Sequence, residues 1–265
     1  MRVLFFITAV LVGSASIGLS APYAAIVVNQ ENGEVLHCEN CDMRLHVAGL
    51  TKLITLYIAF EAIVDGEVSL DDVVTISKKA SEESPVALGL TEGQEIKLRY
   101  LIRAAGVMGA NDASTAIAEH ISGSEEAFAK RMDQRSKRMG MTRSTWRNAH
   151  GLTQSGHLAS PRDIAYLVDA HRRHFLEFFN MFTRRTDNVG FKNVMHSGSR
   201  YLKNAGVEFF KSGYTRAAGY VGAALTKRGR KDRVITVMFG GTSAASRNRQ
   251  MLKLTDLGFQ KLNAR

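Results

Sequence analysis

The apolar positions of the chain predict a pair of strands first, then a helical block, then a second group of strands. Residues 23–29 form an apolar and β-branched run, and residues 34–37 form a second run after an Asn-Gly turn. Near the other end, apolar runs predict strands over residues 209–211, 217–226 and 233–240. Two groups of strands on either side of a helical block favour an α+β fold with an antiparallel sheet, formed by the N-terminal and C-terminal strands.

Helical spacing dominates the middle of the chain. One of these helices starts at Ser160-Pro161-Arg162-Asp163, which offers a serine cap, a proline at the first helical position and an acid in the first turn. Between the helices we expect a short extended segment at 68–77, a loop at 89–97 and a polar loop at 146–156. The predicted helices cover residues 51–64, 100–108, 111–121, 124–139, about 160–174 and 246–262.

Residues 1–20 are predicted to be a secretory signal peptide. A basic start at Arg2 precedes an apolar stretch, and Gly18-Leu19-Ser20 offers a small-x-small cleavage site. A buried strand and an uncleaved anchor remain the alternatives. No later stretch approaches the ~20 apolar residues of a spanning helix. We therefore expect residues 21–265 to form one exported domain, periplasmic or secreted, with no membrane span after removal of the signal.

The net charge of +10 makes an anionic polymer a candidate partner of the chain. Its densest basic run could contact cell-wall peptide, lipid head groups or nucleic acid, but a solvated turn between two strands is the favoured interpretation. Because the protein is predicted to be exported, we expect no nucleic-acid partner. The basic run consists of Lys227, Arg228, Arg230, Lys231 and Arg233.

Cys38 and Cys41 are the two cysteines of the chain and form a C-x-x-C pair. An oxidising compartment favours a short local disulfide between them. Two reduced thiols are the second interpretation. A metal site with His37 or His46 is the third, because one C-x-x-C pair is weak evidence for zinc. We therefore predict neither a metal nor a cofactor.

Several short strings carry a resemblance to a known family. Taken together and in this order, they resemble the serine-type D-alanyl-D-alanine carboxypeptidases, which are low-molecular-mass penicillin-binding proteins of peptidase family S11. The likeness runs from about Tyr23 to Phe259 and implies a β-lactamase/transpeptidase-like fold. The main strings are Leu50-Thr51-Lys52, Ala110-Asn111-Asp112-Ala113, Asn148-Ala149-His150-Gly151-Leu152, Ser160-Pro161-Arg162-Asp163 and Lys211-Ser212-Gly213-Tyr214-Thr215.

The resemblance implies a site with three motifs. In the family, the serine of Ser-x-x-Lys attacks the penultimate D-alanine carbonyl and its lysine is the base, while the serine of Ser-x-Asn relays a proton and its asparagine orients the peptide. The lysine and hydroxyl of Lys-Thr-Gly hold the terminal carboxylate. The matching positions here are Gly49 and Lys52, then Gly109 and Asn111, then Lys211, Ser212 and Gly213.

Glycine at position 49 removes the oxygen that would form the acyl-enzyme. Loss of a serine nucleophile costs about a millionfold in kcat in a well-studied hydrolase, which is ~8 kcal/mol. The favoured hypothesis is an impaired enzyme that binds peptidoglycan stem peptides or β-lactams without a covalent bond, or a cell-envelope protein. The alternatives are an active carboxypeptidase with altered native serines or another rescue, and a basic envelope scaffold. Serines at both Gly49 and Gly109 are expected to restore acylation.

The candidate residues also have purely structural interpretations. Lys52 could be a surface lysine, and Asn111 a helix cap, although the neighbouring motifs favour site roles for Lys52 and Lys211. His150 is assigned to packing and hydrogen bonding. For Arg247 a solvated position at the helix start is favoured over a role in holding a carboxylate.

Overall fold

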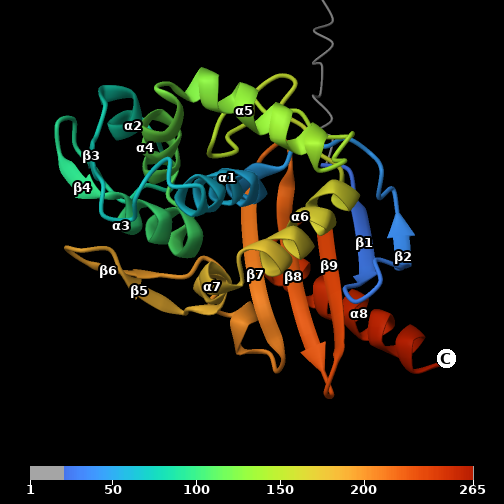
Figure 1. Cartoon of the computed structure of the whole chain (residues 1–265). Helices are drawn as coiled ribbons and strands as arrows, with labels where there is room; N and C mark the ends of the chain where they lie inside the picture. Colours follow the sequence, from blue (N-terminus) through green and yellow to red (C-terminus); the bar gives the residue numbers. More distant parts are fainter. Residues whose placement is uncertain (1–20, 265) are drawn as a thin grey trace, which may run out of the picture.

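A five-stranded antiparallel sheet, in the order β2-β1-β9-β8-β7, runs through the molecule (Figure 1). The computed structural model describes residues 21–264, so the predicted signal peptide and Arg265 lie outside the described residues. Because N-terminal and C-terminal strands share the sheet, the predicted α+β fold is confirmed. The strands are β1 (Ala24–Asn29), β2 (Val35–Glu39), β7 (Val207–Thr215), β8 (Gly219–Arg228) and β9 (Asp232–Gly241).

Both faces of this sheet are covered, which explains why β1 reads as a continuous apolar run. Ala24 and Ile26 enter the core on the helical side, whereas Ala25 and Val27 enter the core under α8 (Ala244–Asn263). Successive side chains of a strand point to opposite faces, so each face needs its own apolar partner. Figure 1 shows α6 (Pro161–His174) across one face and α8 across the other.

The helical block lies at one edge of the sheet, with α1 running through its centre (Figure 1). Nearly every residue of α1 is buried, in agreement with its almost uninterrupted apolar sequence. A short 3-10 helix, η1, leads directly into α1. The helices of the block are η1 (Ala48–Thr51), α1 (Lys52–Val64), α2 (Lys78–Glu82), α3 (Leu98–Arg103), η2 (Ala104–Met108), α4 (Asn111–Ser122) and α5 (Glu125–Arg138).

Several local predictions were incomplete. The expected helix over 100–108 ends as a π-helix, η2, and the expected loop at 89–97 ends in a short strand. Short paired strands and single helical turns lack a periodic signal long enough to identify them. The expected extended segment at 68–77 does contain a strand, β3 (Val73–Thr75), which pairs with β4 (Glu95–Lys97). The elements missed in this way are α2, β4, β5 (Thr186–Asn188) with β6 (Asn193–Met195), α7 (Leu176–Phe179), η3 (Asn180–Thr183) and η4 (Tyr201–Lys203).

Two further predictions have clear outcomes. Cys38 and Cys41 are joined by a disulfide, as the favoured interpretation required. The basic run forms the turn between β8 and β9, where Arg228 pairs with Asp256 and Arg233 pairs with Glu208. Among residues 21–264, no helix combines the length and apolar character needed to cross a membrane.

Candidate functional site

A cleft of about 310 Å³ opens where the start of α1, the end of β7 and the turn between η2 and α4 meet. These three segments carry the three predicted motifs, which lie far apart in the sequence. Six of the seven predicted site residues line this cleft, namely Gly49, Lys52, Gly109, Asn111, Ser212 and Gly213. The seventh, Lys211, is fully buried on β7 beside them.

Lys52 is the best connected of these residues. Its Nζ donates to Asn111 Oδ1 and to the carbonyl oxygen of His150, each at 2.7 Å. The Asn111 side chain also donates to the carbonyl oxygen of Ser84 at 2.9 Å, and it makes no cap bond at the start of α4. The helix-cap interpretation of Asn111 is therefore wrong, and so is the surface interpretation of Lys52, which is 2 % exposed.

Burial also sets the protonation of Lys52. Desolvation lowers its pKa to about 7, although the carboxylates of Glu83 and Asp112 act in the opposite direction. A lysine that titrates near neutral pH is suited to exchange a proton with a ligand. The first motif therefore retains a potential base, whereas the neighbouring position 49 has no hydroxyl for that base to deprotonate.

Gly49 lies in direct backbone contact with β7. A Cβ atom added at Gly49 would be 2.8 Å from the Ser212 carbonyl oxygen and 3.2 Å from the Gly213 Cα. Conversely, a Cβ at Gly213 would be 2.2 Å from the Gly49 nitrogen. Real Cβ atoms do not approach backbone this closely, so a side chain at position 49 requires β7 to shift. The strand backbone thus lies where a side chain would project from position 49.

Lys211 connects β7 to η2 through two buried hydrogen bonds. Its Nζ donates to the carbonyl oxygens of Ala105 and Gly106 at 2.6 and 2.7 Å. Both carbonyls belong to the π-helix η2, whose irregular bonding leaves backbone acceptors for a side chain. Burial, with a smaller contribution from the charge of Lys52, lowers the pKa of Lys211 well below its ordinary value. Gly109, which follows η2, has a φ of +86°, a conformation that favours glycine.

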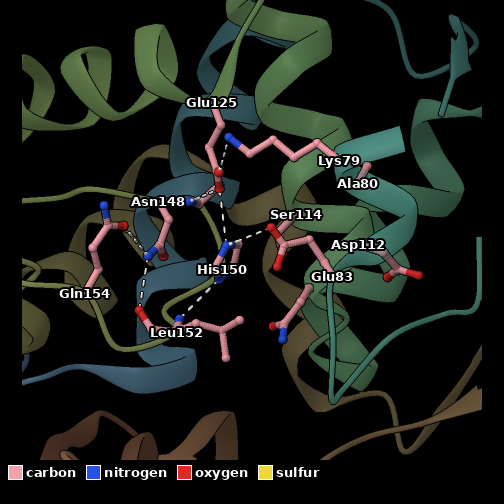
Figure 2. Close-up of polar contacts among 12 residues, drawn as sticks. Lys79, Ala80, Glu83, Asp112, Ser114, Glu125, Asn148, His150, Leu152 and Gln154 are labelled. Atoms are coloured by element: carbon pink, nitrogen blue, oxygen red, sulfur yellow. Dashed lines mark hydrogen bonds and ion pairs between the residues drawn. The ribbon is translucent and has the colours of Figure 1, made fainter. Parts of the chain in front are cut away.

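A polar cluster behind the cleft supports the loop that contacts Lys52. Figure 2 shows His150 between Glu83 and Glu125, with His150 Nε2 at 3.3 and 3.4 Å from their carboxylate oxygens. Lys79 Nζ contacts Glu125 at 3.0 Å, and the Leu152 N–H donates to His150 Nδ1 at 3.1 Å. Because Nδ1 accepts a hydrogen bond, Nε2 is the ring nitrogen that donates toward the two carboxylates.

The predicted packing role of His150 is therefore confirmed, and sequence reasoning missed the acids that provide it. The hydrogen bond from His150 lowers the pKa of Glu83. Glu125 also accepts a bond from the Ala149 N–H at 2.9 Å, so it fixes the backbone beside His150 directly. Glu125 lies in the acidic first turn of α5. In the sequence, acidic residues there indicate the start of a helix, so they do not predict a contact with the distant loop that carries His150.

The favoured interpretation of Arg247 is wrong. This residue lies in the first turn of α8 but is buried, and it lines the cleft. Its guanidinium donates to the carbonyl oxygen of Val221 at 3.3 Å and to Asn248 Oδ1 at 2.8 Å. Desolvation lowers its pKa to about 10, so it stays charged at neutral pH. A buried cation in the cleft wall is suited to hold a carboxylate.

Solved structures with the same fold define the class of protein. Penicillin-binding protein 5 from Haemophilus influenzae superposes with a TM-score of 0.85 and 26% identity, covering 89% of this chain and 70% of that one. Penicillin-binding protein D2 from Listeria monocytogenes, in its ampicillin-bound form, gives a TM-score of 0.81 and 27% identity, with 89% and 96% of the two chains covered. The chain therefore has the fold of the penicillin-binding proteins.

Sequence comparisons identify the family. The family model for D-alanyl-D-alanine carboxypeptidase, Peptidase_S11, matches residues 14–243, so the chain belongs to this family. The D-alanyl-D-alanine carboxypeptidase DacF of Bacillus subtilis is 32% identical over 90% of this chain and 62% of its own length. DacA of Escherichia coli K12 is 29% identical over 89% of this chain and 60% of its own length. The chain thus spans about three fifths of these curated relatives.

Proposed function

We propose that this chain is an exported member of its family that binds the D-alanyl-D-alanine ends of peptidoglycan stem peptides without forming an ester. The observation that carries the proposal is Gly49, which lies in η1 just before α1 and lines the same cleft as Lys52 and Asn111. An acyl-enzyme needs a nucleophilic oxygen, and glycine has none. The chain is therefore proposed to be catalytically impaired but able to recognise the peptide.

The neighbouring hydroxyl of Thr51 is a poor replacement for the missing oxygen. Thr51 Oγ1 lies 2.8 Å from His157 Nε2, and its side chain is fully buried. Burial lowers the pKa of His157 to about 3, so its ring is neutral at neutral pH and forms a fixed hydrogen bond there. Ser197 and Ser212 do line the cleft, so any covalent labelling must be mapped to the residue that carries it.

Binding would use groups that do not depend on position 49. β7 is the last strand of the sheet, so the part of its outer edge that does not contact Gly49 is proposed to pair with the backbone of an extended peptide. Arg247 and the Ser212 hydroxyl line the same cleft and are candidates to hold the terminal carboxylate. Lys52 and Asn111 line the cleft opposite β7. A bound peptide would therefore lie between these two side chains and the strand.

Isothermal titration calorimetry with the full chain tests recognition. The ligand is a soluble stem pentapeptide that ends in D-Ala-D-Ala, and the matched control peptide ends in D-Ala-L-Ala. We expect binding of the first peptide to be at least tenfold tighter, and we expect Arg247→Gln to weaken it by about tenfold because a charge-assisted bond is lost. Lys231→Gln, at the exposed β8–β9 turn, is the control variant and is expected to bind as the unaltered chain does.

Two outcomes would reject the proposal. Equal affinity for both peptides would mean that the cleft does not recognise the terminal D-alanine. Release of free D-alanine from the first peptide, measured with an amino-acid assay, would support the alternative of an active carboxypeptidase. Far-UV circular dichroism of Arg247→Gln shows whether weaker binding reflects a loss of folded structure.

The basic β8–β9 turn favours a second candidate function, an envelope scaffold that docks on anionic polymer. Arg230 and Lys231 are exposed at this turn. Such binding depends on charge, so it should weaken steeply with salt. Salt-sensitive binding to anionic polymer that is lost when Lys227, Arg230 and Lys231 are replaced with Gln, and that is unaffected by Arg247→Gln in the cleft, would favour the scaffold.

A further inference from the structure

The two sulfur atoms of the Cys38–Cys41 disulfide have different surroundings. Cys38 lies on β2, the outermost strand of the sheet, and is exposed. Cys41 follows three residues later and is 1 % exposed, within the core cluster on the helical side. The exposed end of the disulfide is therefore Cys38, and its buried end is Cys41.

Arg162 provides a second difference. Its Nη2 donates to Cys41 Sγ at 3.1 Å, and its backbone N–H donates to the Cys41 carbonyl oxygen at 3.0 Å. The guanidinium is held in place by Asp42, which accepts from Nε at 2.7 Å and from Nη2 at 3.0 Å. The buried sulfur thus has a fixed cationic donor as its neighbour.

This geometry gives the disulfide a chemical direction. When a thiolate attacks a disulfide, the sulfur that leaves takes the electron pair, and a stabilised thiolate leaves faster. A cationic N–H donor stabilises a thiolate at Cys41. The Asp42 carboxylate, 3.7 Å from Cys41 Sγ, opposes part of this effect, because like charges repel. The hydrogen bond from Arg162 lowers the pKa of Asp42, so this carboxylate is charged at neutral pH.

We propose that the Cys38–Cys41 pair is a thiol–disulfide exchange site, in which a dithiol attacks Cys38 and Cys41 leaves beside Arg162. The new bond joins the attacking sulfur to Cys38 Sγ, the Cys38–Cys41 bond breaks, and its electron pair goes to Cys41. The second thiol of the dithiol then displaces Cys38. The dithiol ends as a disulfide, and the protein gains two electrons and two protons. This inference does not depend on the proposed function of the cleft.

The first experiment maps the site of attack in the full oxidised chain. The protein is treated with excess reduced glutathione, quenched with acid, alkylated with N-ethylmaleimide, and digested for mass spectrometry. We expect glutathione on Cys38 and the alkyl group on Cys41 in at least nine tenths of the mixed species. Glutathione distributed equally, or mainly on Cys41, would overturn the proposed direction of attack.

The second experiment measures the exchange equilibrium in mixtures of reduced and oxidised dithiothreitol. Arg162→Met is expected to lower the equilibrium constant for reduction about tenfold, which corresponds to ~30 mV for a two-electron couple. Asp42→Asn is expected to change it in the opposite direction, because it removes the opposing charge. Arg173→Met is the matched control, since Arg173 lies on the same helix and pairs with Asp169 at 2.7 Å, away from the sulfurs.

Circular dichroism of each variant verifies that the oxidised chains are folded alike. If Arg162→Met and the control variant have the same equilibrium constant as the unaltered chain, Arg162 does not stabilise the leaving thiolate and the proposal is wrong. If Arg162→Met does not fold, Asp42→Asn still tests the proposal, because its amide oxygen can accept from Arg162 while the opposing charge is removed. An unchanged equilibrium constant in Asp42→Asn would then overturn the proposal.

Discussion

The two sides of the cleft differ in their contacts: one side has a network of side-chain hydrogen bonds, and the other has a close backbone contact. On the side of α1 and α4, Lys52, Asn111 and the His150 carbonyl form a network of bonds at 2.7 Å. On the side of β7, the backbone of Ser212 and Gly213 lies against Gly49 with no room for a side chain. The difference teaches that an intact polar network around Lys52 lies opposite a strand backbone that leaves no space for a side chain at position 49.

The largest effect is expected from Lys211→Met, because it removes the donor of two buried carbonyls. Each unsatisfied buried acceptor costs about 1–3 kcal/mol, so we expect a loss of about 3 kcal/mol in the free energy of unfolding, measured by urea denaturation. Lys203→Met, at an exposed lysine of η4, is the control and should change it by less than ~0.5 kcal/mol. A stable Lys211→Met variant would show that η2 does not need this lysine.

The next effect concerns Gly49, and here the structure changes the expectation from the motifs. Gly49→Ser places a Cβ 2.8 Å from the Ser212 carbonyl oxygen, so we expect a loss of about 2 kcal/mol. Gly49→Ala adds the same Cβ without a hydroxyl and should cost as much. Gly109→Ser adds strain because of the positive φ, so the double serine variant should acylate only weakly. Efficient acylation of that variant by penicillin would contradict the conclusion that the β7 backbone leaves no space for a side chain at position 49.

A smaller effect follows from the pKa of Lys52. A lysine titrates near 10.5 in the unfolded chain and near 7 here, so between these values the unfolded state binds more protons. Stability therefore rises with pH in this window, by about 1 kcal/mol between pH 7.5 and 8.5. Lys52→Met should lose this part of the slope in urea denaturation. Parallel slopes for the two proteins would mean that Lys52 remains charged.

The smallest effect is expected at the β8–β9 turn. This turn follows the end of β8, whereas the cleft residues of β7 pair with the beginning of β8. Replacing Lys227, Arg230 and Lys231 with Gln should change stability by less than ~0.5 kcal/mol, because surface charges contribute little. Binding of the stem pentapeptide should be unchanged. A tenfold loss of peptide affinity would show that the basic turn and the cleft act together.

The sequence was sufficient for features that depend on local pattern. The strands 23–29 and 233–240 and the helix of α1 carry strong apolar signals, and the three motifs meet at one cleft as the resemblance implied. What it could not predict depends on distances between separate segments. The contact of Gly49 with β7, the bonds from Lys211 to η2 and the burial of Arg247 all arise from tertiary packing, which no spacing in the chain encodes.

Intact-protein mass spectrometry after incubation with excess benzylpenicillin tests the central claim most directly, with an active family member treated in parallel. Without a hydroxyl at Gly49, the chain is expected to keep its unmodified mass while the parallel protein gains one penicillin. A gain of one penicillin by this chain, mapped to Ser197, Ser212 or any other residue of the cleft, would contradict the account.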